Sequence, residues 1–249
     1  MKQTSKPWYE AAFEADYLNR YAHRSDQAAT EEVEFLIRVL GLPKDARVLD
    51  LCSGAGRHSR ALSAKGLRVV SLDLSMDLLR AGRTRQGSSL AIRSDVRWLP
   101  FPDARFDGVV NLFTSFGYFE SEDDNFAVLR NASRVLRPGG VLVLDFLNLE
   151  PTLVGLEARS ERHVGRARMI EQRSYDKQRG RLMKRIRIED PDAPVRELQE
   201  SVRAYAPHEL AELLDRAGLK EHEPYGDLRG GAFDKARSPR CVWVARKDK

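Results

Sequence analysis

The chain has 249 residues, and its 42 Lys and Arg against 37 Asp and Glu leave a formal net charge of +5. This length suits one large domain or one domain with an appendage, and the composition excludes a collagen, a low-complexity disordered chain and a disulfide-stabilised scaffold. Two cysteines, Cys52 and Cys241, are too few for a disulfide framework. No apolar run reaches the roughly 18 residues of a membrane span, and no signal peptide is visible. We therefore expect a globular, cytoplasmic protein.

Helical and extended patterns alternate through the first part of the chain. The stretch 8–40 is aromatic and helical, and Gly41 with Pro43 ends it. Beyond it, the pattern predicts strands at 47–51, 67–73, 91–95, 106–111 and 141–146 and helices at 58–65, 76–83 and 125–136. Strands that alternate with helices are typical of a parallel sheet covered by helices on both faces.

The pattern changes after Pro151. Residues 163–175, 181–190 and 195–205 alternate apolar and polar side chains, and the segment 177–180 between the first two is typical of a hairpin turn. These features predict a small antiparallel sheet inserted into the α/β body.

The first pattern returns near the end of the chain, with a helix predicted at 207–217 and a strand at 240–245. The predicted organisation therefore has three parts. They are an N-terminal helical segment (1–30), an α/β domain (31–150 and 206–249) and an antiparallel insert (151–205).

The most informative local signal is a strand that runs into a glycine turn, Asp50-Leu51-Cys52-Ser53-Gly54-Ala55-Gly56, with a helix behind it. Glycine serves where φ is positive or where a ligand must approach the main chain closely. NAD-binding folds share such a turn, but Ser59 stands at the position of their third glycine. An acid inside the strand, Asp50, suits a ligand with a positive charge near the turn. The alternative is a tight strand-to-helix turn without a ligand.

Two more aspartates end the next two predicted strands. Asp73 lies 17 residues after Gly56, where a carboxylate can accept hydrogen bonds from both hydroxyls of a ribose. Asp73 could instead cap a helix, but Ser75 is the better cap for a helix that starts at Met76, which leaves Asp73 free. Asp95 could accept from an exocyclic amine such as that of adenine, or it could be an ordinary turn aspartate.

Five motifs follow one another in a fixed order. They are Asp50–Gly56, Leu72-Asp73-Leu74-Ser75, Ser94-Asp95-Val96 with Leu99-Pro100-Phe101, Phe106–Val110 and Leu136-Arg137-Pro138-Gly139-Gly140. Their order and spacing resemble those of class I S-adenosylmethionine-dependent methyltransferases, above all the small-molecule enzymes of the type 11 and type 25 groupings. The resemblance covers about residues 30–150 and continues more weakly to the C-terminus.

The resemblance implies a Rossmann-like α/β fold. Its seven-stranded, mostly parallel sheet would have the order 3-2-1-4-5-7-6, with an antiparallel strand 7 formed by 241–245 and a small antiparallel β insert. Cys241 would then be a buried structural thiol.

The resemblance also implies S-adenosylmethionine as the cofactor. Asp50 and the carbonyl groups around Gly54 would hold the methionine ammonium, and Asp73 would hold the ribose. Asp95 would accept from the adenine edge, and Asn111 would lie beside the methyl donor. The N-terminal segment would form a lid over the cofactor. The cofactor-binding residues implied in this way are Asp50, Gly54, Gly56, Asp73, Leu74, Asp95, Val96, Asn111, Tyr9, Tyr17 and Tyr21.

The methyl acceptor is predicted to be a small molecule. The segment after the strand 106–111 lacks the paired prolines of enzymes that methylate exocyclic amines of bases, and neither cysteine is placed as a cytosine nucleophile. The aromatic run 113–119 could wall an acceptor pocket, or it could pack under the sheet. Alignment of donor and acceptor supplies most of the rate of such a displacement, although a hydroxyl acceptor benefits from a base. His163 is the candidate base, and no Cys/His cluster has metal-ligand spacing.

A basic segment, 158–187, holds 11 Lys and Arg but 3 Asp and Glu. It could be the solvated face of an alternating sheet, or it could attract an anionic acceptor or a nucleic acid. Few aromatic residues interleave these charges, which argues against a stacking platform for bases. We predict methyl transfer to nitrogen or oxygen of a small molecule, with neither nucleic acid nor membrane as partner. The alternatives are a non-catalytic S-adenosylmethionine-binding or RNA-associated protein and, less favoured, an NAD-dependent oxidoreductase.

Overall fold

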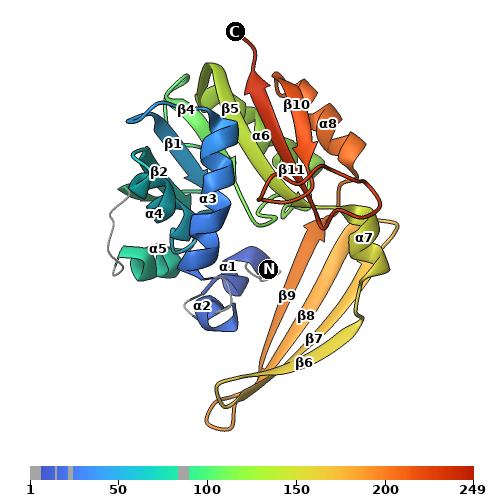
Figure 1. Cartoon of the computed structure of the whole chain (residues 1–249). Coiled ribbons are helices and arrows are strands. Elements are labelled where there is room, and N and C mark those ends of the chain that lie inside the picture. The colour runs from blue at the N-terminus through green and yellow to red at the C-terminus, as the bar shows by residue number, and fades with distance from the viewer. Residues whose placement is uncertain (1–6, 15, 22–24, 84–89) are drawn as a thin grey trace, which may run out of the picture.

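The computed structural model describes residues 7–14, 16–21, 25–83 and 90–249, so parts of the predicted N-terminal segment lie outside the described residues. Two sheets organise this part of the chain, a seven-stranded central sheet between helices and a four-stranded sheet that extends away from it (Figure 1). Among these residues we find no helix with the length and apolar character needed to span a bilayer.

The central sheet has the strand order β10-β11-β5-β4-β1-β2-β3. Its strands are β1 (Arg47–Leu51), β2 (Arg68–Asp73), β3 (Leu90–Arg93), β4 (Phe106–Asn111), β5 (Leu136–Leu147), β10 (Leu219–Tyr225) and β11 (Arg240–Lys247). The pairs among β1 to β5 are parallel, whereas β11 is antiparallel to both β5 and β10. The predicted order, with the last strand antiparallel between strands 5 and 6, is confirmed. Cys241 on β11 is fully buried, as predicted.

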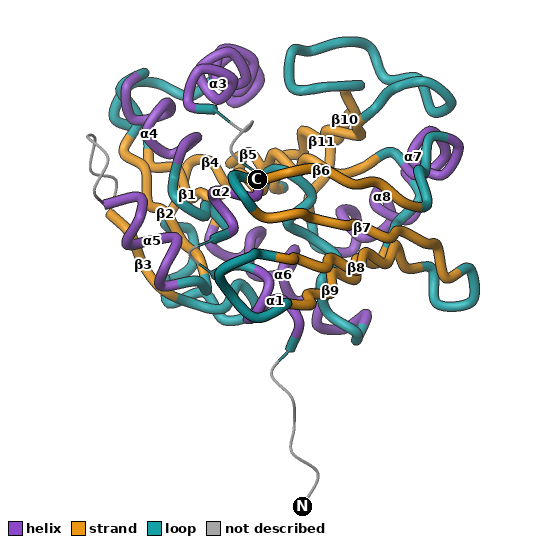
Figure 2. Tube along the Cα trace, turned by 90° about the horizontal axis from the view of Figure 1, so that it is seen from below, coloured by secondary structure: helices purple, strands orange, loops and turns teal. Residues whose placement is uncertain are grey.

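Helices cover both faces of the central sheet (Figure 2). α3 (Asp26–Leu40) and α4 (Arg57–Ala64) share one apolar cluster with the sheet, and α6 (Glu122–Val135) and α8 (Pro207–Arg216) share the other. α5 (Met76–Arg83) packs against β2 and β3. In α3 the buried side chains recur every three or four residues, the spacing of one helix face. Ser25 caps its N-terminus and Gly41, with a φ of 58°, ends it.

The second sheet is the predicted antiparallel insert. Its strands β6 (Arg159–Val164), β7 (Ala167–Asp176), β8 (Arg181–Glu189) and β9 (Arg196–Arg203) pair in chain order. The predicted hairpin turn is confirmed, because Asp176 pairs with Arg181 across it. The predicted single strand 163–175 is wrong: Gly165, with a φ of 60°, turns the chain between β6 and β7. A short helix, α7 (Leu149–Val154), leads into the insert.

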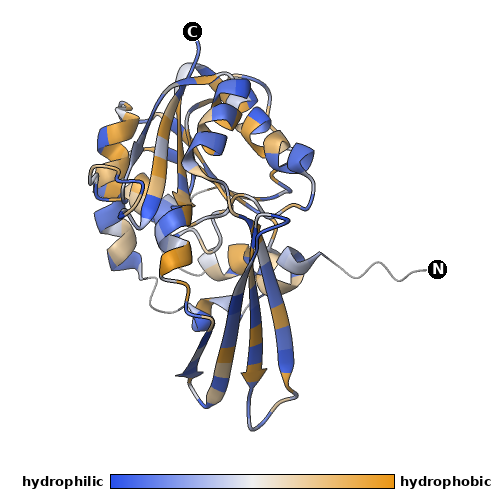
Figure 3. Ribbon diagram, turned by 90° about the vertical axis from the view of Figure 1, so that its right-hand side faces the viewer, coloured by the Kyte–Doolittle hydropathy of each residue, from blue (hydrophilic) through white to orange (hydrophobic). Residues whose placement is uncertain are grey.

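Hydropathy alternates along the strands of this insert (Figure 3). One of its faces packs against the N-terminal helices α1 (Trp8–Ala12) and α2 (Tyr17–Arg20), and α1 lies against β9. The insert therefore supports the segment that precedes the central sheet in the chain.

Two predicted boundaries shift within the central layer. The helix predicted at 125–136 begins at Glu122, because Ser121 accepts a hydrogen bond from the amide of Asp124 as its cap. β5 begins at Leu136 instead of residue 141, since Leu136 already pairs with Phe106 before the register shifts.

Candidate functional site

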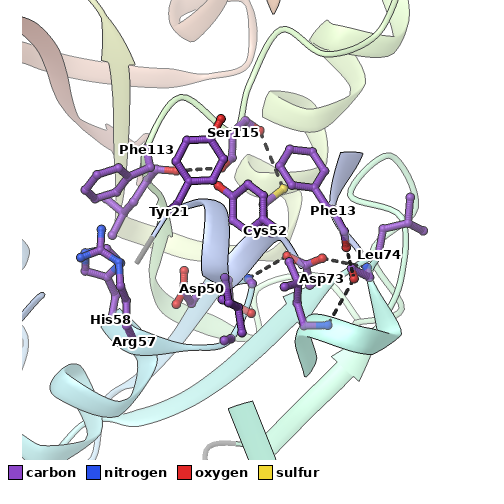
Figure 4. Close-up of a pocket in the computed structure, with 18 of the residues that line it drawn as sticks. Phe13, Tyr21, Asp50, Cys52, Arg57, His58, Asp73, Leu74, Phe113 and Ser115 are labelled. Atoms are coloured by element: carbon purple, nitrogen blue, oxygen red, sulfur yellow. Dashed lines mark hydrogen bonds between the residues drawn. The ribbon is translucent and has the colours of Figure 1, made fainter. Parts of the chain in front are cut away.

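A cavity of about 370 Å³ lies at the carboxyl ends of the central strands (Figure 4). The glycine turn after β1, the ends of β2 and β3 and the loop after β4 form its walls, and α1 and α2 contribute aromatic side chains. Ligands of open α/β sheets bind outside the carboxyl ends of the strands. The cavity is therefore the candidate functional site.

Nine of the predicted cofactor residues line this cavity. They are Tyr9, Tyr17, Tyr21, Asp50, Gly54, Asp73, Leu74, Asp95 and Val96. The other two do not reach its surface. Gly56, with a φ of 70°, forms the N-terminal cap of α4, and Asn111 is 1% exposed behind the wall.

Asp50 is buried at 2% exposure beneath the glycine turn. Its Oδ2 accepts a hydrogen bond of 2.5 Å from Ser59 Oγ, which in turn accepts one of 2.7 Å from Ser71 Oγ. Burial raises the pKa of the Asp50 carboxyl, although the nearby His58 and the Ser59 hydroxyl act in the opposite direction. Ser59, noted in the sequence only because it is not glycine, thus holds the carboxylate that the site needs.

Asp73 is not free, contrary to the prediction. Its Oδ2 accepts the Gly54 amide at 2.7 Å and its Oδ1 accepts the Ser75 amide at 2.8 Å. Ser75 does cap α5, since its Oγ accepts the amide of Leu78 at 3.2 Å. Each carboxylate oxygen has a second lone pair, so Asp73 can still accept from a ligand while it fixes the glycine turn.

Asp95 forms an ion pair that the sequence reading missed. Arg97 donates to both carboxylate oxygens, with Nη2 2.7 Å from Oδ2, and its amide also donates to Oδ1 at 2.8 Å. The guanidinium of Arg97 lies 4.4 Å above the Phe119 ring and also binds Asp124 at 2.9 Å. The sequence signal for this ion pair was Arg97 itself, a basic residue two positions after Asp95.

The N-terminal helices are fixed over the cavity by aromatic and polar contacts. The Phe13 ring stacks on Tyr118 at 5.8 Å, and Ser75 Oγ donates to the Phe13 carbonyl at 2.5 Å. Tyr21 accepts a hydrogen bond of 2.6 Å from Lys184 of β8 and donates one of 3.2 Å to Glu200 of β9. The insert thus reaches the cavity through Tyr21, a link that the sequence did not indicate.

The structure does not bring His163 to the cavity. Its side chain is exposed on β6, an edge strand of the insert, and it is absent from the cavity wall. An exposed edge position cannot hold a base against an enclosed acceptor. His58 does lie in the wall, at 6% exposure, with its Nε2 2.6 Å from Glu32 Oε2.

The aromatic run after β4 is divided between the cavity wall and the apolar core, and its contact with an acceptor stays a prediction. Phe113, Tyr118 and Phe119 line the cavity, whereas Phe116 belongs to the apolar core. Burial raises the pKa of the Cys52 thiol in the same wall well above its usual value, which disfavours the thiolate form.

The chain is similar to known methyltransferases in sequence and in fold. A methyltransferase domain model matches residues 48–140. The chain is 33% identical to demethylmenaquinone methyltransferase of Corynebacterium kroppenstedtii over 78% of this chain and 77% of that protein. It is 34% identical to glycine/sarcosine N-methyltransferase of Halorhodospira halochloris, over 51% of this chain and 50% of that protein. The chain likewise spans only about half the length of several other curated relatives that it matches.

Solved structures extend the likeness to the insert. The CcbJ methyltransferase of Streptomyces caelestis superposes with a TM-score of 0.79 at 20% identity, and the match covers 96% of this chain and 98% of that one. At this identity the likeness concerns the fold, and it includes the antiparallel sheet as well as the central one.

Proposed function

Because the chain belongs to the class I S-adenosylmethionine-dependent methyltransferases, we propose that it transfers the methyl group of S-adenosylmethionine to a nitrogen or oxygen atom of a small molecule. One observation carries this proposal. Asp50, Asp73 and Asp95, which end three neighbouring strands, all line one cavity beside the glycine turn.

The polar groups around the glycine turn fit such a cofactor. Ser53 Oγ, in the cavity wall, is buried without a hydrogen-bond partner among the described residues. Buried polar atoms are normally hydrogen bonded, so unpaired ones beside a cavity favour a polar ligand there. Asp50 adds a carboxylate for a cationic group.

In this proposal Asp50 and the carbonyls near Gly54 hold the methionine ammonium, and Asp73 accepts from the ribose hydroxyls. Leu74 and Val96 flank the adenine, and Asp95 accepts from its edge. Tyr9, Tyr17 and Tyr21 close the site from the N-terminal side, while Gly56 and Asn111 support it from behind the wall.

The cofactor supplies an activated methyl group on a sulfonium, and the protein aligns the acceptor with it. A well-oriented pair of reactants gains most of its rate from alignment, so no protein nucleophile is needed. The relatives named above differ in their acceptors, and the proposal therefore stays at a nitrogen or oxygen of a small molecule.

The two other candidate functions have less support. A buried carboxylate at position 50 would repel the pyrophosphate of NAD, and Ser59 holds that carboxylate in place. The basic segment is largely neutralised, because seven of its eleven basic residues form ion pairs. Over the whole insert, 151–205, 13 Lys and Arg face 9 Asp and Glu.

Calorimetry with S-adenosylmethionine and with NAD tests the cofactor. We expect binding of the first and none of the second. Transfer of radiolabelled methyl groups to a panel of small amines, alcohols and carboxylic acids then tests the reaction. Tight cofactor binding without transfer to any panel member would favour the non-catalytic alternative.

A further inference from the structure

Two consecutive residues after β4 have a strained backbone. Phe113 and Thr114 have φ angles of 58° and 56°, in the left-handed region. Few residues other than glycine adopt this region, and a β-branched residue such as threonine is an outlier there. Such strain persists only where the surroundings impose it, and it concentrates at functional sites.

A buried ion pair imposes this conformation. Asp145, fully buried near the end of β5, accepts the Phe113 amide on Oδ2 at 2.8 Å, and its carbonyl accepts the Thr114 amide at 3.0 Å. Arg240, at the start of β11, donates through Nε to Asp145 Oδ1 at 2.8 Å. Its Nη2 also donates to Thr114 Oγ1 at 3.0 Å. Neither Asp145 nor Arg240 lines the cavity itself.

The strained turn presents side chains to the cavity. Phe113 and Ser115 both line it, and the guanidinium of Arg57 lies 4.1 Å from the centre of the Phe113 ring. In Figure 4 Phe113 and Ser115 lie above Asp50 and Asp73. With the cofactor held along the carboxylates, as in the proposed function, the Phe113 wall borders the space left for the acceptor.

We propose that Asp145 and Arg240 are positioning residues for the methyl acceptor. They hold the Phe113–Thr114 turn in its strained form, so that the Phe113 ring contacts the acceptor and fixes its distance from the methyl donor. A displacement of about 1 Å in such an alignment lowers rates by about a hundredfold. This inference rests on the proposed function, because it needs a methyl acceptor in the cavity.

Thr114→Gly is the first test, because it removes the Oγ1 that Arg240 binds and lets residue 114 adopt conformations other than the left-handed one, while a positive φ costs it no strain. A purely structural turn would become easier to form and would leave recognition unchanged. We expect an unchanged or higher melting temperature and an unchanged affinity for S-adenosylhomocysteine. The kcat/KM for the panel compound that the wild type methylates should fall at least about tenfold.

Ala104→Gly is the matched control. Ala104 also has a positive φ, 54°, but it is exposed in the turn before β4, at the other end of that strand. This variant should match Thr114→Gly in melting temperature and the wild type in acceptor kcat/KM. An unchanged acceptor kcat/KM in Thr114→Gly would overturn the inference.

Arg240→Ala with added guanidinium is the second test. The Arg240 side chain is 27% exposed, so a small cation can reach its place from solvent. We expect the acceptor kcat/KM to fall at least tenfold and to recover in part with millimolar guanidinium, but not with urea. Arg240→Lys, which keeps the charge without the fork of donors, should lie between the two. A loss that guanidinium does not restore would contradict a positioning role.

Activity of the wild type separates the positioning role of Asp145 and Arg240 from the proposed methyl transfer. If the wild type binds no S-adenosylmethionine, or methylates no panel compound, the proposed function fails and the inference falls with it. If the wild type is active and the variants keep its acceptor kcat/KM, only the inference fails.

Discussion

Asp73 connects two parts of the site through a single side chain. Its carboxylate accepts the amide of Gly54 in the glycine turn and the amide of Ser75 at the start of α5. Burial raises the pKa of this carboxyl, although the main-chain donors counteract the shift. A substitution at Asp73 therefore affects both the ligand contact and the turn.

We expect Asp73→Ala to weaken S-adenosylmethionine binding by about 1.5–3 kcal/mol, the range for a hydrogen bond to a charged group. Calorimetry measures the affinity, and circular dichroism checks the fold. Asp192→Ala, in an exposed turn of the insert, is the control and should bind normally. Unchanged affinity in a folded Asp73→Ala protein would rule out the ribose contact.

Asp50 gives the site a pH dependence. Its pKa lies above the usual 3.8 because the carboxyl is buried. Folded protein therefore binds this proton more tightly than unfolded protein, and the stability contribution of Asp50 is lost as pH rises from 3.8 through the raised pKa. Cofactor binding follows the opposite direction, because an ammonium pairs with the ionised carboxylate.

We expect the affinity for S-adenosylmethionine to fall as pH falls through the raised Asp50 pKa, starting at a higher pH than an exposed aspartate would give. Calorimetry across acid to neutral pH measures this. Asp50→Asn should bind more weakly and show less pH dependence. Since Asp73 remains in that variant, the difference between the two proteins isolates Asp50. Equal pH slopes would contradict the assignment.

At the scale of elements, the sequence patterns predicted some strands closely and missed others. β1, β2 and β4 were predicted within a residue, because each is a short apolar run bounded by turn residues. The pattern did not predict β10, because Lys220, Glu223 and Pro224 interrupt its apolar residues. Its pairing with β11 also shifts register between Lys220 and Glu223. The division into β6 and β7 was missed for another reason. The alternation of apolar and polar residues continues through the short turn at Gly165, so the sequence does not mark the end of β6.

The contact between the insert and the N-terminal helices also has a measurable effect. Arg196 of β9 binds Asp16 at 2.7 Å and Glu14 at 3.2 Å, beside the helices that cover the cavity. Partly exposed ion pairs contribute about 0.2–1 kcal/mol. We expect Arg196→Gln to speed the release of S-adenosylhomocysteine about two- to fivefold, measured by stopped-flow fluorescence.

Arg187→Gln is the control for this effect. Arg187 pairs with Glu189 and Glu197, which both belong to the insert. Its release rate should equal that of the wild type. Equal rates for both variants would show that the Arg196 pairs do not hold the N-terminal helices over the site.

At the scale of the whole molecule, the family and the three strand-end aspartates were accessible from sequence, whereas their environment was not. Motif order places Asp50, Asp73 and Asp95 because parallel strands end at one edge of the sheet. Lys184 acts through a contact with the distant Tyr21, which periodicity does not encode. Ser59 and Arg97 lie close in the chain to the aspartates that they bind, but the order of the motifs does not indicate these contacts. His163 lies away from the cavity, on the edge strand β6. The sequence pattern did not show that β6 and β7 are separate strands, so this position could not be predicted.

The charge of the insert leads to a prediction about nucleic acids. Because most of its arginines are paired, few remain to release counterions from phosphates. We expect weak binding of RNA and DNA at about 50 mM salt and none at about 200 mM, measured by fluorescence anisotropy. Sub-micromolar binding at the higher salt would favour the RNA-associated alternative.

The double contact of Asp73 has a consequence for how the two halves of the cofactor are sensed. The carboxylate that would accept from the ribose in the proposed function also accepts the amide of Gly54, beside which the amino acid end would lie. A nucleoside that fixes this carboxylate would also fix the glycine turn. The amino acid half would then bind to a turn that is already ordered, at a smaller cost in conformational entropy. Adenosine and methionine added together should therefore bind more tightly than their separate affinities imply, and the site would respond to the joined molecule more than to either fragment in the metabolite pool.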